Sequence, residues 1–158
     1  MKKIIIVLSL FVLIGCKAKK TNQVPEVEEI KTVKLALTAV NSNQKDKAYD
    51  LGKRILMTCN TSKFKPFTTT EATRSVINNI TLEKLSKTCA KYRQWYGSFI
   101  DLKLVEVYQN STDQSTVFRF KALYTKAVAN KELRVFMNDE NQLTAVKTLD
   151  WTDSFSFK

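Results

Sequence analysis

The spacing of apolar residues changes once along the chain, at Gly97. Upstream of Gly97, apolar residues recur every three or four positions in two stretches, which is the period of a helix that buries one face. This spacing predicts a helix over residues 45–59 and a longer helix over residues 81–96. Between them, Thr68-Thr69-Thr70-Glu71 has the capping-box pattern and predicts a short helix that ends near Asn78.

Downstream of Gly97, apolar and polar residues alternate, as in a strand that buries one face. Four such runs are separated by polar turns, and they begin at Ile100, Val117, Leu133 and Leu143. In the first run, Asp101 alternates with Ile100 and Leu102, so we expect its side chain to point away from the apolar face. Helices followed by a four-stranded meander predict an α+β fold, with the helices on one face of an antiparallel sheet.

The first residues of the chain have the pattern of an export signal. Two lysines precede an apolar run over residues 4–14, which is too short to span a bilayer and is typical of a signal peptide. The run ends in Leu13-Ile14-Gly15-Cys16, which resembles the lipobox of bacterial lipoproteins. This resemblance implies a diacylglyceryl group on the sulfur of Cys16 and cleavage of the chain just before that residue.

The same resemblance implies an organisation in three parts: a lipoprotein signal peptide over residues 1–15, a lipidated N-terminus and flexible linker over residues 16–40, and one α+β domain over residues 41–158. It implies a bacterial cell-envelope protein whose partner is the membrane, reached through the lipid anchor. Lys17 stands where enterobacterial lipoproteins of the inner membrane carry Asp, so the outer membrane is favoured over the inner one.

The chain contains three cysteines. With Cys16 assigned to the lipid, Cys59 and Cys89 remain, and an oxidising envelope favours a disulfide between them. The alternative is two buried, reduced thiols.

Composition narrows the chemistry. The 158 residues include no histidine, which excludes Ser-His-Asp and Cys-His catalysis and histidine-ligated metals, and no Gly-rich phosphate loop is present. The three acidic residues of the linker (Glu26, Glu28 and Glu29) are too close together to form a calcium site without further ligands, so we expect no metal and no cofactor. The net charge is +11, but no nucleic-acid-binding motif accompanies it, and we expect no nucleic-acid partner.

The order of the predicted elements resembles the nuclear transport factor two-like superfamily. The resemblance rests on a long helix that ends in Trp95-Tyr96-Gly97, the junction Gly97-Ser98-Phe99-Ile100, and the hairpin over residues 134–143. It implies a curved sheet and helices that form a cone with a pocket at the wide end. A cystatin-like sheet wrapped on one helix is the alternative fold.

Enzymes of that superfamily place an Asp inside the cone, often with Tyr or His. Because this chain lacks histidine and Asp101 is expected to face solvent, no catalytic residue is carried over. Aromatic residues with polar edges could line the mouth of the pocket or belong to the core. They are Tyr92, Trp95, Tyr96, Tyr108, Tyr124 and Trp151. Three basic residues on neighbouring strands, Arg119, Lys121 and Arg134, could form an anion-binding surface or a solvated face.

Taken together, the sequence predicts a lipid-anchored envelope protein that is a non-enzymatic binding module for an envelope protein, a glycan or a small apolar ligand. One alternative is an enzyme that uses Asp101 or a tyrosine in the cone as acid or base. Another is an inhibitor or immunity-type lipoprotein.

Overall fold

A computed structural model describes residues 32–157 of the chain. The predicted signal peptide, Cys16 and residues 16–31 of the predicted linker lie outside these residues. Among the described residues, no helix combines the length and apolar character that a membrane crossing requires.

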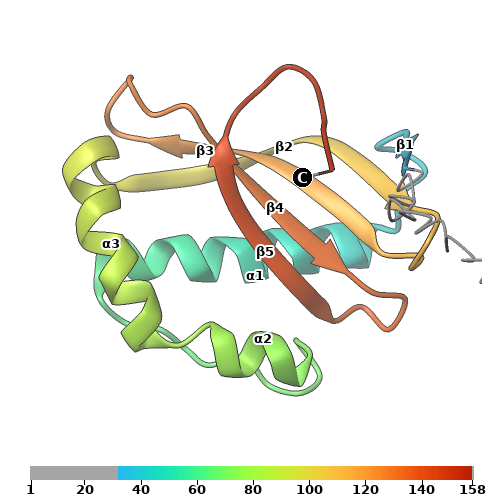
Figure 1. The fold of residues 1–158 in the computed structure, drawn as a ribbon, viewed down its shortest axis with the longest axis horizontal. Helices are drawn as coiled ribbons and strands as arrows, with labels where there is room; N and C mark the ends of the chain where they lie inside the picture. Colours follow the sequence, from blue (N-terminus) through green and yellow to red (C-terminus); the bar gives the residue numbers. More distant parts are fainter. Residues whose placement is uncertain (1–31, 158) are drawn as a thin grey trace, which may run out of the picture.

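Five antiparallel strands form one sheet in the order β1-β2-β3-β4-β5 (Figure 1). The strands are β1 (Thr32–Leu35), β2 (Phe99–Asn110), β3 (Thr116–Tyr124), β4 (Lys131–Met137) and β5 (Leu143–Asp150). The α+β class is confirmed, and the sheet has one strand more than the four predicted.

The additional strand, β1, comes from the stretch that the sequence assigned to the linker. Its four residues pair with the distal part of β2, with Thr32 opposite Asn110 and Leu35 opposite Val107. A run of four residues is too short to establish an alternating period, and this strand is held by pairing with residues more than 70 positions away.

In the described part of the chain, three helices precede the meander: α1 (Ser42–Thr61), α2 (Arg74–Asn79) and α3 (Leu82–Tyr96). The two long helices match the prediction, and the short one begins later than the capping-box pattern indicated. Glu71 does accept a hydrogen bond from the backbone N–H of Thr68, but its carboxylate also receives two bonds from Arg54, at 2.7 and 3.0 Å. The hydrogen bonds from Arg54 are the main cause that lowers the pKa of Glu71 to about 2. The motif therefore fixes a loop against α1 and does not start α2.

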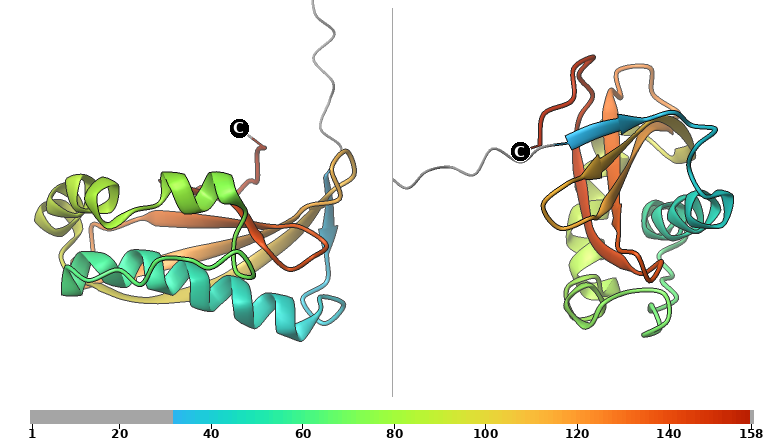
Figure 2. Two further views of the ribbon diagram at one scale, coloured as in Figure 1. Left: turned by 90° about the horizontal axis from the view of Figure 1, so that it is seen from below. Right: turned by 90° about the vertical axis from the view of Figure 1, so that its right-hand side faces the viewer.

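Helix α1 lies along one face of the sheet and supplies much of the core (Figure 2). Its fully buried residues, such as Ala48 and Leu51, pack in one cluster with Phe118 and Leu133 of the central strands. The approach is closest at Gly52, where a Cβ would lie 2.8 Å from Leu133 Cδ2. A glycine at this position lets the backbone of α1 rest directly on β4.

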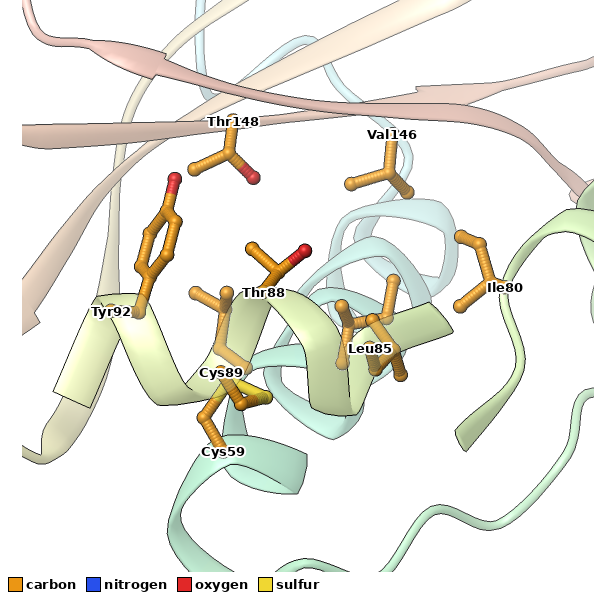
Figure 3. A pocket seen from close by; sticks show the side chains of 10 residues that line it. Cys59, Ile80, Leu85, Thr88, Cys89, Tyr92, Val146 and Thr148 are labelled. Atoms are coloured by element: carbon orange, nitrogen blue, oxygen red, sulfur yellow. A yellow bond between two sulfur atoms is a disulfide. The ribbon is translucent and has the colours of Figure 1, made fainter. Parts of the chain in front are cut away.

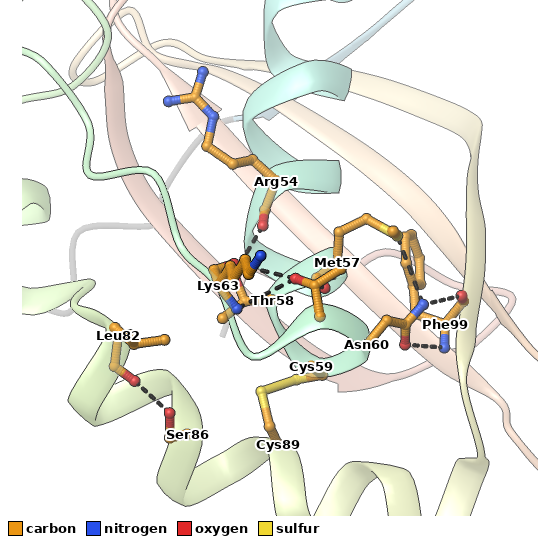
Figure 4. The surroundings of a disulfide bond; sticks show 11 residues. Arg54, Met57, Thr58, Cys59, Asn60, Lys63, Leu82, Ser86, Cys89 and Phe99 are labelled. Atoms are coloured by element: carbon orange, nitrogen blue, oxygen red, sulfur yellow. Dashed lines mark hydrogen bonds between the residues drawn. A yellow bond between two sulfur atoms is a disulfide. The ribbon is translucent and has the colours of Figure 1, made fainter.

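The far end of α1 is joined to two other elements (Figure 4). Cys59 of α1 and Cys89 of α3 lie at disulfide distance, with an S–S separation of 2.06 Å, which confirms the predicted pairing. The next residue, Asn60, bonds through its side-chain amide to both the backbone N–H and the backbone C=O of Phe99. Helix α3 and the start of β2 are thus both held against the same turn of α1.

Candidate functional site

A partly enclosed pocket of about 200 Å³ lies between α3 and β5 (Figure 3). The disulfide holds α3 against α1 on one side of it, and Tyr92 reaches from α3 to Thr148 of β5 on the other. The space between these two connections is not filled by side chains. Its lining residues are Ile55, Leu56, Cys59, Ile80, Leu85, Thr88, Cys89, Tyr92, Val146 and Thr148.

The chemistry of this pocket is mostly apolar, because its walls are aliphatic side chains and the disulfide. Of the residues that the structure describes, none with a charged side chain lines the pocket, and the polar side-chain groups are the hydroxyls of Thr88, Tyr92 and Thr148. Burial raises the pKa of Tyr92, so its hydroxyl stays neutral at physiological pH. The arrangement suits a small apolar molecule with a hydrogen-bonding group at one end.

Only one of the six predicted pocket-lining aromatics, Tyr92, lines this pocket. Tyr96 and Tyr124 pack against the ring of Tyr92 and form a cluster beside the pocket. Their ring centroids lie 5.3 and 6.4 Å from the centroid of Tyr92. Burial raises the pKa of Tyr124, whose hydroxyl is buried and has no hydrogen-bond partner within residues 32–157. Lys131 places its ammonium 5.1 Å from the centroid of Tyr96.

The other three aromatics lie away from the pocket. Trp95 is exposed, with the ammonium of Lys91 at 4.3 Å from its ring centroid. Tyr108 stacks on Phe155 and Trp151 lies over Arg119, so both belong to the face of the sheet opposite to α1. The sequence did not distinguish these three residues from Tyr92, because all four have the size and polarity of a residue that lines a pocket.

Asp101 lies outside the pocket. Its carboxylate accepts hydrogen bonds from the Tyr49 hydroxyl at 2.6 Å and from the Lys53 ammonium at 3.0 Å, and these partners hold its pKa below the usual range. It is therefore ionised and paired at neutral pH, which gives no support to the alternative of a cone-pocket acid or base at this residue.

The alternation predicted for the start of β2 is wrong at Ile100. A register shift between Phe99 and Asp101 places two residues opposite one on β3, as in a β-bulge. Phe99 and Leu102 are buried in consequence, and Ile100 is 54% exposed. No residue in the run marks the bulge by its type.

The predicted anion-binding surface also requires correction. Arg119 is 0% exposed and Arg134 only 4% exposed, so neither offers its charge to an outside anion. Both guanidinium groups donate to Glu132, which is itself fully buried, and Arg119 also donates to Glu106 at 2.7 Å. Lys121 is partly exposed and lies 5.6 Å from the ring centroid of Trp151.

Sequence reasoning missed both Glu132 and the segment that covers this face. Glu132 lies two positions before Arg134 and so shares its side of β4, which is a signal of pairing that the sequence does carry. In the part of the chain that the structure describes, no group of three or more Cys, Asp or Glu side chains could hold a metal ion.

Comparisons of the chain with models of protein families, with characterised proteins and with solved structures find no match. The resemblances to bacterial lipoproteins and to the nuclear transport factor two-like superfamily therefore stay predictions.

Proposed function

We propose that this protein is a lipid-anchored binding protein of the bacterial cell envelope that holds a small apolar ligand between α3 and β5. The observation that carries the proposal is the pocket of about 200 Å³, which has apolar walls and three hydroxyl groups. The lipobox-like sequence before Cys16 supports the location in the envelope.

Rigid surroundings support binding in this pocket. The disulfide forms part of the wall, and buried core residues of α1, such as Ile55 and Leu56, form another part. A pocket with fixed walls loses little conformational entropy on binding, so contact with an apolar ligand can contribute fully to affinity. The hydroxyl groups of Tyr92 and Thr148 can orient one polar atom of the ligand.

A tryptophan at position 88 is expected to block this pocket. Thr88 lies at its exposed rim, so an indole there can cover the mouth without entering the core. We expect Thr88→Trp to bind 1-aminoanthracene, a neutral apolar fluorophore, at least about tenfold more weakly than the wild type, which corresponds to about 1.4 kcal/mol. Fluorescence titration measures the difference.

The matched control is Lys87→Trp, which adds the same side chain to the neighbouring exposed position of α3, outside the pocket lining. This variant should bind the fluorophore as the wild type does. Equal binding by the wild type and Thr88→Trp, with the fold intact, would contradict the pocket as the ligand site.

The anchor is tested separately with Cys16→Ser in the exporting bacterium. Without the thiol, no diacylglyceryl group can be attached, so we expect the protein to leave the membrane fraction and become soluble without detergent. Fractionation followed by immunoblotting measures this. A Cys16→Ser protein that still requires detergent would contradict lipid anchoring while leaving the pocket proposal untouched.

A further inference from the structure

The face of the sheet opposite to α1 is covered by the C-terminal segment, residues 151–157, which follows β5 (Figure 2). Arg134 and Phe136 of β4 point to this face, and their neighbours Leu133 and Val135 belong to the core on the α1 side. The segment starts at the end of β5, which is an edge strand, and it contacts residues of β2, β3 and β4.

Two arginines bind the main chain of the segment. Arg119 Nη2 donates a hydrogen bond to the backbone C=O of Thr152, and Arg134 Nη1 donates one to the backbone C=O of Ser156, at 2.5 Å. Because both acceptors are peptide carbonyls, any extended peptide can supply them.

Aromatic rings supply the side-chain contacts of the segment. Phe155 stacks face to face on Tyr108, with centroids 3.9 Å apart, and the guanidinium of Arg134 lies 4.8 Å from the Phe155 centroid. Phe157 meets Phe136 edge to face at 5.9 Å. Two aromatic side chains at alternate positions of the segment therefore contact two aromatic residues of this face, Tyr108 and Phe136.

The donors on this face are held in place by the domain itself. Glu132 receives hydrogen bonds from both arginines, and Glu106 receives one from Arg119 and one from Lys34. These three cations, together with Lys121 and Lys147 on the same face, outnumber the two carboxylates. The Nε–H of the buried Arg119 has no acceptor among the described residues. The face therefore keeps an excess of positive charge and one unused donor, both of which favour an acidic or polar peptide.

The segment itself is weakly tied to the domain. Within residues 151–157, Trp151 alone makes a backbone-to-backbone hydrogen bond, to Asn130, and no residue of the segment pairs with a strand. Its remaining contacts are a hydrogen bond from the Asn130 side chain to the Trp151 carbonyl, the approach of Lys121 to the Trp151 ring, and the contacts with the two arginines and the rings. A competing peptide has to replace only these.

We propose that this face is a recognition site for an extended peptide of a partner protein, with two aromatic side chains at alternate positions, and that the C-terminal segment occupies it in cis. The segment then acts as a tethered competitor. Its presence lowers the apparent affinity for the partner by the fraction of time that the site is open.

The test uses the full chain with Phe155→Ala and Phe157→Ala, which removes the ring contacts of the segment and keeps the arginines and glutamates. The probe is a fluorescein-labelled peptide with the sequence of residues 151–157, Trp-Thr-Asp-Ser-Phe-Ser-Phe. We expect the double variant to bind this peptide at least about tenfold more tightly than the wild type by fluorescence anisotropy. The matched control, Ser154→Ala with Ser156→Ala, keeps both rings and should bind as the wild type does.

A second measurement avoids the double variant, in case that variant does not fold. In the wild type, millimolar peptide should speed hydrogen exchange of the Trp151 N–H, which is bonded to the backbone C=O of Asn130, and a peptide with alanine in place of both phenylalanines should not. Unchanged exchange at millimolar peptide would overturn the proposal, as would equal affinity of a folded double variant and the wild type. If the wild type is a dimer and the peptide dissociates it, the partner is a second copy of this chain, and the proposal is overturned.

Discussion

Replacing Glu132 with glutamine is expected to lower the free energy of unfolding by about 3–5 kcal/mol. The Glu132 side chain is fully buried and accepts hydrogen bonds from both Arg119 and Arg134. Glutamine has the same shape but no charge. Arg134 would then have no carboxylate partner among the described residues, and Arg119 would keep only Glu106, which it shares with Lys34. Removing one member of a buried ion network costs this much because desolvated charge is left without compensation.

Urea unfolding followed by circular dichroism measures this loss. The control is Glu83→Gln on α3, where an exposed pair with Lys87 contributes about 0.5 kcal/mol or less. A variant in which Arg119, Glu132 and Arg134 are all replaced by Met or Leu should lose less than Glu132→Gln alone, since it leaves none of these three charges buried. A loss below about 1 kcal/mol for Glu132→Gln would show that the network is not closed to water.

Removing the disulfide is expected to have the second largest effect. The bond between Cys59 and Cys89 closes a loop of 30 residues. The chain-entropy model gives a contribution of about 3–4 kcal/mol for a loop of this length, so Cys59→Ala with Cys89→Ala should lower the free energy of unfolding by that amount. The variant should also bind the apolar fluorophore more weakly, because both cysteines line the pocket.

The same urea experiment on wild-type protein with and without reductant provides the control, since reduction breaks the bond without changing the sequence. Both routes should give a similar loss of stability. Full labelling of Cys59 and Cys89 by a thiol reagent in unfolded, unreduced protein would contradict the disulfide.

Helix and strand periods were sufficient to predict the two long helices and the α+β class, whereas the cysteine pair was predicted from the assignment of Cys16 to the lipid and an oxidising envelope. Cys59 and Cys89 each fall on the apolar side of a helix, and two such helices must pack together to bury those sides. Periodicity failed for β1, which has four residues, and for Ile100, which follows a register shift that no residue type marks.

The candidate sites were harder to predict, because they depend on what covers each face. Alternation correctly put Arg119 and Arg134 on one side of the sheet, but whether that side meets solvent depends on residues 151–157. This segment has no helix or strand period beyond the alternation of Phe155, Ser156 and Phe157. The pocket depends on the distance between α3 and β5. The disulfide and Tyr92 set this distance together.

The register of β1 sets the end of the sheet at which the preceding residues join the domain. Thr32 lies opposite Asn110, at the end of the sheet where β2 turns into β3, and α3 joins the other end of β2 through Gly97. Residues 16–31 can extend to at most about 55 Å, so a lipid on Cys16, as proposed, would hold Thr32 within about that distance of the membrane surface. In a protein anchored as proposed, the pocket between α3 and β5 would therefore lie farther along the domain from the point of attachment than the turn between β2 and β3 does.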